Sequence, residues 1–229
     1  ITLTHFAPVI TIPRLYHLRP LGRNELQNRL ELLLRRTGAP ALSIEELRLG
    51  SETPRPNAAL VGIGSTSRVL LTDTLLSDYS DDEIEVVLAH EIGHFMHNDV
   101  WKTMAFETAA ALLIFGAAQL AFYQAGPSFG LVNLPDVVGF PILVLVGGAV
   151  LLILTPIRNM ISRHHERQAD RYALAVTKKP EAFISGLRRL ATQSLAEEQP
   201  SRLAEWLFYS HPPLSDRLAT ANARKLSSV

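Results

Sequence analysis

Two long apolar runs constrain this chain more than any other feature of its sequence. Residues 103–124 contain one charged residue, Glu107, and residues 137–157 contain none. A helix that crosses a bilayer needs about 20 mainly apolar residues, and both runs reach that length. Two buried core helices of a soluble protein are the alternative. The turn-rich link at 126–136 between the runs instead favours a hairpin of two transmembrane helices.

Composition argues against several classes of function. Lysine and arginine together number 22, as do aspartate and glutamate, so the formal net charge is zero. A balanced chain gives no reason to expect a nucleic-acid partner. The sequence contains no cysteine, which excludes disulfide bonds and thiol catalysis.

The first part of the chain predicts one helix and a few short strands. Leucines recur at helical spacing between Asn24 and Gly38. Asn24 with Gln27 predicts a capping box at the start of this helix, and Gly38 predicts its end. Two prolines precede the second predicted strand, 58–63, and place that strand at a sheet edge. Runs typical of strands occupy residues 43–50, 58–63 and 68–72.

Helices dominate the remainder of the sequence. Ser80 and Glu83 form a second capping-box pattern, which predicts a helix that continues through Phe95. Further helices are predicted at residues 157–176 and 181–196. The fold class that follows is mainly α with a small β-sheet, in addition to the hairpin.

A short motif within the predicted helix carries recognisable chemistry. Residues 90–94 read His-Glu-Ile-Gly-His. On a helix, His90 and His94 lie one turn apart on the same face, so two neutral imidazoles can bind one zinc ion. Glu91 lies beside them, where it can act as the catalytic base that takes a proton from water. Two surface histidines are the alternative, but the capping box and the apolar face support the helix that the motif requires.

A catalytic zinc ion usually has three protein ligands, so one more must come from elsewhere in the chain. Glu166 and Asp170 lie one helical turn apart in the predicted helix 157–176 and can face one site. We expect Glu166 to bind the metal. We expect Asp170 to accept a hydrogen bond from a ligand imidazole, His90 being the first candidate. Without the histidine motif, two such carboxylates would be interpreted as a solvated face.

Three other histidines compete for the third ligand position. His97 follows His94 by three residues, and His164 and His165 immediately precede Glu166. His97 would crowd a helix that already offers two ligands. We therefore expect these three side chains to line the site or an interface.

The arrangement of these motifs resembles the integral-membrane gluzincins, which include the type-I CAAX prenyl endoproteases and the HtpX heat-shock proteases. The resemblance pairs the motif at 90–94 with residues 162–170, Ser-Arg-His-His-Glu-Arg-Gln-Ala-Asp, across the two apolar runs. The proline-rich start, Phe6 to Leu21, is similar to the CAAX type and favours that branch. Similar stretches also occur at Arg55-Pro56-Asn57-Ala58, at Asp73-Thr74-Leu75-Leu76 and at Ser210-His211-Pro212, followed by Arg217.

The resemblance implies roles for residues that spacing alone does not single out. Asn57 and the backbone of Ala58 would bind an extended peptide by adding it to a sheet edge. His211 would be a catalytic residue near the scissile carbonyl, and Arg217 would brace the site. Without the resemblance, Asn57 would be interpreted as a turn residue and His211 as a loop histidine.

The resemblance also predicts how the chain is organised. We expect a single metallopeptidase domain over residues 1–229, with a gluzincin-type core. Full-length members carry further N-terminal membrane helices, which we expect to be missing from this sequence. The catalytic part would comprise residues 14–102 and 158–229, interrupted by transmembrane helices at 103–124 and 137–157.

Charge around the apolar runs predicts the orientation in the membrane. A hairpin brings the motif helix and Glu166 to the same side of the bilayer. The link at 124–136 contains no lysine or arginine, whereas Lys102, Arg158 and three later arginines flank the other ends. The positive-inside rule then places the catalytic side in the cytoplasm.

The sequence therefore predicts a multi-pass integral membrane endopeptidase with one zinc ion per chain, which hydrolyses peptide bonds with a metal-activated water. The resemblance implies a peptide or protein substrate, either a prenylated CAAX tail or, in a bacterial relative, a misfolded membrane protein. A catalytically silent scaffold that keeps zinc for structure is one alternative, which the presence of Glu91 disfavours. A zinc hydrolase acting on a non-peptide bond is another, which the expected peptide-binding edge disfavours weakly.

Overall fold

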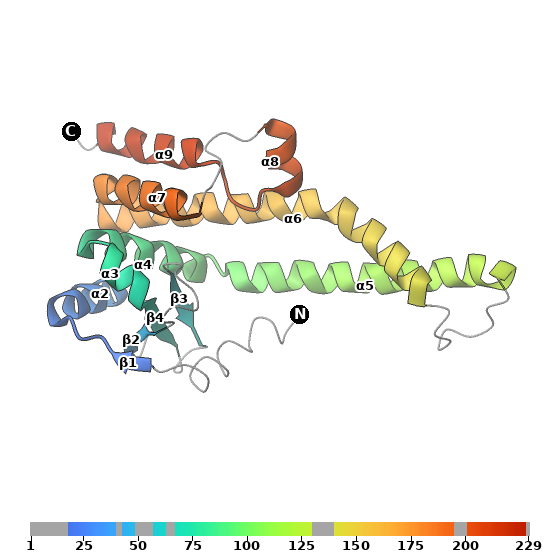
Figure 1. Ribbon diagram of the computed structural model, residues 1–229, viewed down its shortest axis with the longest axis horizontal. Coiled ribbons are helices and arrows are strands. Elements are labelled where there is room, and N and C mark those ends of the chain that lie inside the picture. The colour runs from blue at the N-terminus through green and yellow to red at the C-terminus, as the bar shows by residue number, and fades with distance from the viewer. Residues whose placement is uncertain are drawn as a thin grey trace.

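The fold is mainly helical with one small mixed sheet, as the sequence predicts. The computed structural model describes residues 18–39, 43–48, 57–62, 67–129, 140–194 and 201–227. The proline-rich start, the prolines before the second strand, the ends of two predicted strands and most of the link between the apolar runs lie outside these residues. A long hairpin of two helices extends from one end of a bundle of shorter elements (Figure 1).

The sheet places one strand at an edge near the centre of the molecule. Strand β4 pairs in parallel with β2 and antiparallel with β3, and β1 pairs antiparallel with β2, giving the order β1-β2-β4-β3. Strand β3 therefore forms an edge among the described strands, which confirms the position predicted from the prolines before it. The strands span Leu18–Pro20 (β1), Ser43–Leu47 (β2), Ala58–Val61 (β3) and Arg68–Thr72 (β4).

Helix α2, Asn24–Thr37, packs its leucines into the core between the sheet and the motif helix. The predicted capping box at its start is wrong: the N-cap is Arg23, and no side chain caps it. Asn24 is already the first residue of the helix, so its side chain does not stand at the cap position. The amide of Gln27 donates to Glu31 one turn ahead, over 2.9 Å. The predicted end at Gly38 is confirmed, since this glycine adopts a φ of 70° that other residues disfavour.

The motif helix α4, Asp81–Met96, follows the short helix α3, Asp73–Asp78. Its capping box is confirmed, because Ser80 accepts from the amide of Glu83 and the Glu83 carboxylate accepts from the amide of Ser80. Ile84, Leu88, Ala89 and Ile92 of α4 are fully buried, which fixes the direction in which the motif side chains project. Asn98 then takes a left-handed φ of 56°, which asparagine tolerates. This residue separates α4 from the next helix.

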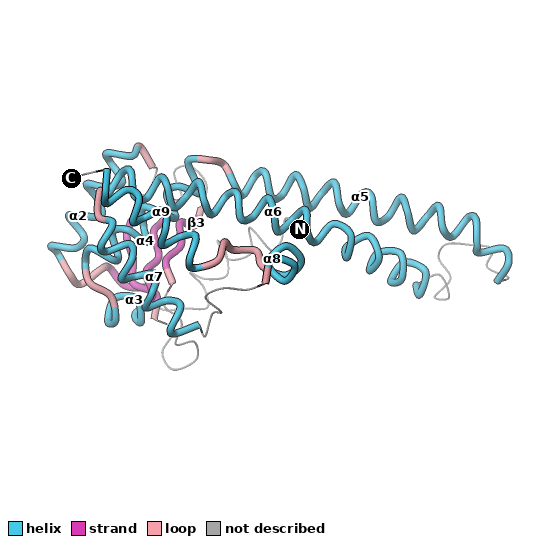
Figure 2. Tube along the Cα trace, turned by 90° about the horizontal axis from the view of Figure 1, so that it is seen from above, coloured by secondary structure: helices cyan, strands magenta, loops and turns pink. Residues whose placement is uncertain are grey.

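Two helices form the hairpin and are long and apolar enough to cross a membrane. Helix α5, Asp99–Ala125, is followed by the short 3₁₀ helix η3, Gly126–Phe129, and helix α6 spans Phe140–Thr177. Only 11% of the most apolar window of each helix is buried, so neither resembles the core helix of a soluble protein. Figures 1 and 2 show the two helices side by side from two directions.

Helix α6 corrects the expectation that a new helix begins at Ile157. The second apolar run and the segment that carries Glu166 form one continuous helix, with Pro156 inside it. Proline lacks the N–H needed for the helical hydrogen bond and bends a helix rather than always ending it. Figure 1 shows α6 bending in this region. The site is thus connected rigidly to the apolar hairpin.

Helices α4 and α6 approach very closely where the ligand segments meet. A Cβ atom built on Gly93 would lie 2.9 Å from the Cα of Ala169, a separation that real side chains do not tolerate. Glycine is therefore required within the motif because another backbone occupies the space. This close crossing brings the histidines of α4 within reach of Glu166 and Asp170.

The described C-terminal part is largely helical. Helix α7, Pro180–Ser194, covers α4 and matches the predicted helix at 181–196. The tail then forms helices α8, Arg202–Phe208, and α9, Leu214–Ser227, which pack against α6. In Figure 1, α9, α7 and α6 lie on one side of α4, and the sheet lies on the other.

Candidate metal centre

Three side chains from two helices converge at the crossing of α4 and α6. His90 and His94 project from one face of α4, and Glu166 projects from the buried face of α6. The Nε2 atoms of the two imidazoles are 3.1 Å apart. Each lies 3.5 Å from a different carboxylate oxygen of Glu166. The structure thus brings together the three ligands expected from the sequence.

These separations fit a tetrahedral zinc ion. Bonds of about 2.0–2.1 Å to nitrogen and oxygen in a tetrahedron imply roughly 3.3 Å between neighbouring ligand atoms. The two Nε2 atoms are 3.1 Å apart, and each lies 3.5 Å from the nearer carboxylate oxygen of Glu166, which is close to that value. One ligand atom from each of the three residues lies within 4.8 Å of the other two. Three ligands from the chain leave a fourth position for water or substrate, which is the arrangement of catalytic zinc sites. The residues present therefore fit the metal.

Asp170 and Arg217 support the first histidine. The Nδ1 atom of His90 lies 3.0 Å from a carboxylate oxygen of Asp170. Arg217 donates two hydrogen bonds to the same carboxylate, over 2.8 and 2.6 Å, and approaches Glu166 within 3.9 Å. A carboxylate at Nδ1 favours the tautomer whose Nε2 has a free lone pair for the metal. The structure thus places Asp170 beside His90 and Arg217 beside Asp170, and their roles stay predictions.

Asp99 has the same relationship to the second histidine and was missed by sequence reasoning. Its carboxylate lies 3.0 Å from Nδ1 of His94, and its side chain is buried. It also approaches His165 within 3.5 Å and Lys102 within 3.4 Å. Asp99 is the first residue of α5 and follows His94 by five positions, which is not the spacing of one helical face. The signal that was available is an acidic residue in the first turn of a helix.

The carboxylates give the centre a strong preference for positive charge. Burial opposes a charge on His90, but Asp170 and Glu166 outweigh it and raise the pKa of His90 to about 9. Burial likewise opposes a charge on His94, yet Glu166 and Asp99 raise its pKa. The reciprocal effect of the imidazoles overcomes burial and lowers the pKa of Glu166. A cation is therefore the partner that this group of side chains favours.

Glu91 lies beside the ligands in a different environment. Burial raises the pKa of its carboxyl group, while the neighbouring His90 and His94 lower it less strongly. A raised pKa brings a carboxylate closer to the value that suits a general base near neutral pH. Glu91 also lines the cavity at the metal ligands, so a water molecule in that cavity would lie close to its carboxylate.

A cavity of about 440 Å³ opens in front of the three ligands. At one end, His211 lies with its Nε2 atom 3.5 Å from Glu166, on the exposed segment between α8 and α9. At another, Asn57 and Ala58 lead into the edge strand β3. The remaining wall is largely apolar and comes from α3, α4 and α7: Leu75, Tyr79, Val86, Val87, Ala182, Phe183, Leu187 and Leu190.

The three competing histidines do not join the ligands. Nδ1 of His97 donates to the carbonyl oxygen of Gly93, over 2.7 Å, which turns the ring back onto its own helix. His164 is exposed, and its ring lies beside that of His165. His165 is buried against Asp99 rather than against Glu166. In the described part of the chain, one metal-binding group emerges, and it contains none of these three residues.

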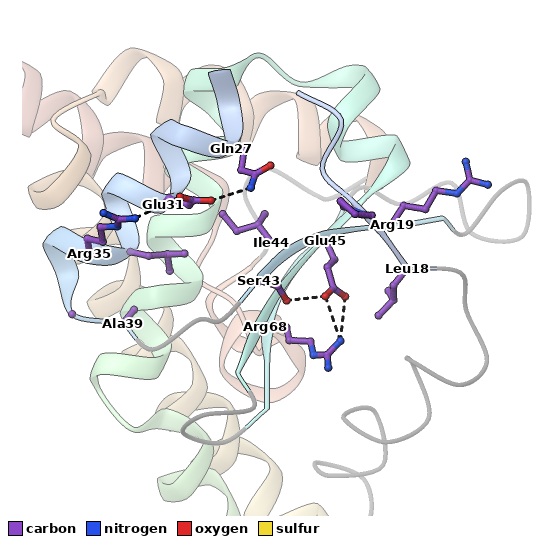
Figure 3. A pocket seen from close by; sticks show the side chains of 13 residues that line it. Leu18, Arg19, Gln27, Glu31, Arg35, Ala39, Ser43, Ile44, Glu45 and Arg68 are labelled. Atoms are coloured by element: carbon purple, nitrogen blue, oxygen red, sulfur yellow. Dashed lines mark hydrogen bonds and ion pairs between the residues drawn. The ribbon is translucent and has the colours of Figure 1, made fainter. Parts of the chain in front are cut away.

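A larger hollow of about 850 Å³ lies away from the metal ligands, between α2 and the strands β1 and β2. Figure 3 shows that most of its polar side chains are engaged with one another, whereas Arg19 points away from them. Gln27 donates to Glu31, and both Ser43 and Arg68 donate to Glu45. Its lining contains no histidine and no cluster of free carboxylates among the described residues, so it offers no comparable chemistry.

Comparisons with known proteins agree with this geometry. The chain is 32% identical to CAAX prenyl protease 1 of Saccharomyces cerevisiae, over 92% of this chain and 50% of that protein. It is 30% identical to a protease HtpX homologue of Campylobacter concisus, over 89% of this chain and 76% of that protein. The crystal structure of Ste24p from S. mikatae superposes with a TM-score of 0.79 at 29% identity, covering 96% of this chain and 54% of the other.

The chain spans about half the length of several of the curated relatives that it matches. The family model that matches is that of peptidase family M48, over residues 20–225. This match covers the sheet, the motif helix, the hairpin and the C-terminal helices. The chain therefore belongs to peptidase family M48.

Proposed function

We propose that this chain is the catalytic part of a zinc-dependent membrane endopeptidase. The observation that carries the proposal is the spacing of the ligand atoms of His90, His94 and Glu166, which suits a tetrahedral zinc ion with an open position. Membership of a metallopeptidase family and the location of Glu91 at the same cavity support it. Zinc, rather than another divalent metal, is favoured by a set of two imidazoles and one carboxylate.

Glu91 performs the proton transfers in this proposal. A zinc ion at the three ligands supplies Lewis acidity, which polarises a carbonyl oxygen and acidifies water. Glu91 accepts the proton of the attacking water and later delivers it to the leaving amine. Its buried position keeps its pKa above the ordinary value, so the protonated form that must donate is within reach.

His211 and Arg217 contribute in different ways. The imidazole of His211 borders the cavity next to Glu166, so it can donate a hydrogen bond to the oxygen that becomes negative as the tetrahedral intermediate forms. Arg217 is partly buried at the wall of the cavity and holds the carboxylate of Asp170, so it acts through the ligand His90. His211 is thus proposed as a catalytic residue and Arg217 as a positioning residue.

The peptide would bind along strand β3. This strand is an edge in the described sheet, and Asn57 and Ala58 at its start line the cavity. The backbone of Asn57 is held by Thr72, whose hydroxyl accepts from its amide over 2.9 Å, so the edge is fixed in place. An extended substrate can add to such an edge through main-chain hydrogen bonds. The apolar wall from α4 and α7 then suits a hydrophobic side chain of the substrate.

The hairpin would anchor the enzyme as a multi-pass membrane protein with its catalytic side in the cytoplasm. The apolar faces of α5 and α6 are exposed, as a lipid environment requires. Lys102 and Arg158 lie at the ends of the hairpin that face the catalytic part, which is the orientation that the positive-inside rule favours. Prenylated CAAX tails and other membrane-associated proteins are the substrates suggested by the names of the relatives.

Metal analysis combined with peptide hydrolysis tests the proposal. The purified protein should contain about one zinc ion. It should hydrolyse internal peptide bonds of library peptides rather than bonds at the peptide ends. His90→Ala, His94→Ala and Glu166→Ala should each lose most of the metal. His97→Ala and His164→Ala are matched controls that should retain it. A chain that binds zinc but cleaves no peptide would favour the silent scaffold, and cleavage of only non-peptide bonds would favour the other hydrolase.

A further inference from the structure

Helix α8 exposes apolar side chains although it lies outside the apolar runs. Leu203 is 66% exposed, Trp206 is 51% exposed and Phe208 is 74% exposed. The less exposed positions of α8 are Ala204, Glu205 and Leu207. Among them, the carboxylate of Glu205 lies 3.6 Å from the guanidinium of Arg163, which is itself buried. This helix therefore exposes large apolar side chains that a helix in contact with water normally buries, while its carboxylate faces the protein.

The attachment of α8 to α6 is rigid and specific. Arg163 donates to the carbonyl oxygens of Glu205 and Tyr209, over 2.9 and 2.6 Å. Asn159 donates to the carbonyl oxygen of Leu207 over 2.7 Å. Carbonyl groups of a last helical turn have no partner within the helix, so these two side chains satisfy the C-terminal end of α8. The exposed apolar face is consequently held in one orientation.

The position of this attachment along α6 can be compared with the expected boundary of the bilayer. The charge-free run ends at Ile157, and Arg158 follows it. With a rise of about 1.5 Å per residue, Asn159 and Arg163 lie about 3 and 9 Å beyond that end. A bilayer has a polar interfacial layer of roughly 5–8 Å on each side of its hydrocarbon core. When the apolar run spans the core, Asn159 therefore lies within this layer and Arg163 at its outer edge, so α8 is attached at the level of the interface.

The direction of α8 agrees with such a location. In Figure 1, α8 runs across the long axis of the hairpin, at the place where α6 leaves the bundle. Figure 2, turned by 90°, shows α8 end-on, so both views place it roughly perpendicular to the hairpin. Because the hairpin crosses the bilayer, a helix perpendicular to it lies parallel to the membrane surface.

We propose that α8 is an interfacial helix that inserts Leu203 and Trp206, one turn apart on the same face, into the headgroup region of the lipid bilayer. Tryptophan is favoured at this depth because its ring is apolar and its N–H is polar. His211 follows Phe208 by three residues, so the segment that borders the metal centre is tied directly to the membrane surface. A substrate that is itself held at the surface would thus meet the cavity without leaving the lipid. This inference rests on the proposed membrane location of the hairpin.

Depth-dependent quenching of tryptophan fluorescence tests the inference. The chain has two tryptophans, so Trp101→Phe leaves Trp206 as the only emitter. The full chain is reconstituted into phosphatidylcholine vesicles whose acyl chains carry bromine at a shallow or a deep position, and iodide is added outside. Trp206 should lose more emission to shallow bromine than to deep bromine, and iodide should quench it severalfold less than a water-exposed tryptophan. Unchanged metal content and circular dichroism show that the variant is folded.

Two further single-tryptophan proteins, both with Trp101 and Trp206 replaced by Phe, calibrate the result. Leu226→Trp, at a position 80% exposed on α9 at the far end of the bundle, should respond to iodide and not to bromine. Leu145→Trp, at a position 73% exposed within the second apolar run, should respond to deep bromine. Failure of Leu145→Trp would overturn the hairpin itself. A second outcome would overturn the role of α8 alone. In it, Leu145→Trp responds to deep bromine as expected, but Trp206 is either quenched by iodide or shielded from both quenchers by another protein surface.

Discussion

The Nδ1 atom of His94 lies 3.0 Å from a carboxylate oxygen of Asp99, the same distance that separates Nδ1 of His90 from Asp170. Each proposed histidine ligand therefore has its own buried carboxylate on the side away from Glu166. The two carboxylates come from different helices, α5 and α6, so the centre ties the motif helix to both arms of the hairpin.

Replacement of Asp99 should weaken metal binding without removing a ligand. Asp99→Asn keeps the size of the side chain but removes the charge that favours the Nδ1–H tautomer of His94. Loss of such a partner typically lowers metal affinity by about 10- to 100-fold. Competition with a chelator measures this directly, and Asp170→Asn should behave alike. Lys102→Met, which removes an exposed neighbour of the same carboxylate, is the control. Equal affinities for wild type and Asp99→Asn would show that Asp99 serves only the fold.

Gly93 should not tolerate even a methyl group. In Gly93→Ala, the new Cβ would lie 2.9 Å from the Cα of Ala169, so α4 and α6 must separate. Overpacking of this kind typically costs about 1–3 kcal/mol, and the shift should also reduce metal content. Thermal unfolding in detergent, together with metal analysis, measures both effects.

Gly186→Ala provides the matched comparison, because this helical glycine has only an ordinary contact, 3.6 Å from Glu83. Alanine there should be neutral or should stabilise α7 by up to about 1 kcal/mol. If both alanines have the same effect, the close crossing at Gly93 does not limit the packing.

The orientation of the hairpin can be checked because the chain has no cysteine of its own. Single cysteines at Ser128, beyond the end of α5, and at Ser185, on the exposed side of α7, should react with an impermeant maleimide from opposite sides of the membrane. The positive-inside rule predicts that Ser185 is on the cytoplasmic side. Labelling of both cysteines from the same side would contradict the proposed transmembrane hairpin.

His211 should affect turnover rather than binding. It is proposed to contact an oxygen whose negative charge exists only in the transition state, so its loss should lower kcat and leave KM almost unchanged. Loss of one such donor typically costs about 10²- to 10³-fold in kcat. Steady-state kinetics of His211→Ala, with metal content as the control, measures the split. A large rise in KM at constant kcat would make His211 a residue that binds substrate instead.

Local patterns allowed much of this architecture to be predicted. The capping box at Ser80 and the apolar face after it determine a helix, and a helix alone brings His90 and His94 onto one face. The partner segment with Glu166 and Asp170 follows the same periodic logic. Gly93 appears in the motif as an unremarked small residue, and only the crossing with Ala169 explains it.

Other features depend on tertiary contacts that no short pattern encodes. Asp99 reaches His94 only because Asn98 takes a left-handed conformation between the two helices. The helix predicted to begin at residue 157 instead continues the apolar helix, which passes through Pro156 with a bend. The side-chain cap expected from Asn24 is absent because the helix begins one residue earlier, which places Arg23 at the cap position. The attachment of α8 depends on Asn159 and Arg163, which lie far from it in sequence.

Glu91→Gln provides the most direct test of the central claim, that Glu91 is the base beside a zinc ion held by His90, His94 and Glu166. The substitution keeps the shape of the side chain and removes only the base. Zinc content and the rate of peptide hydrolysis are measured on the same sample. Zinc should stay at the wild-type level. The rate should fall almost to background, by at least the roughly 10²- to 10⁴-fold that general-base catalysis typically contributes. Turnover that persists at the wild-type rate with zinc bound would contradict the account.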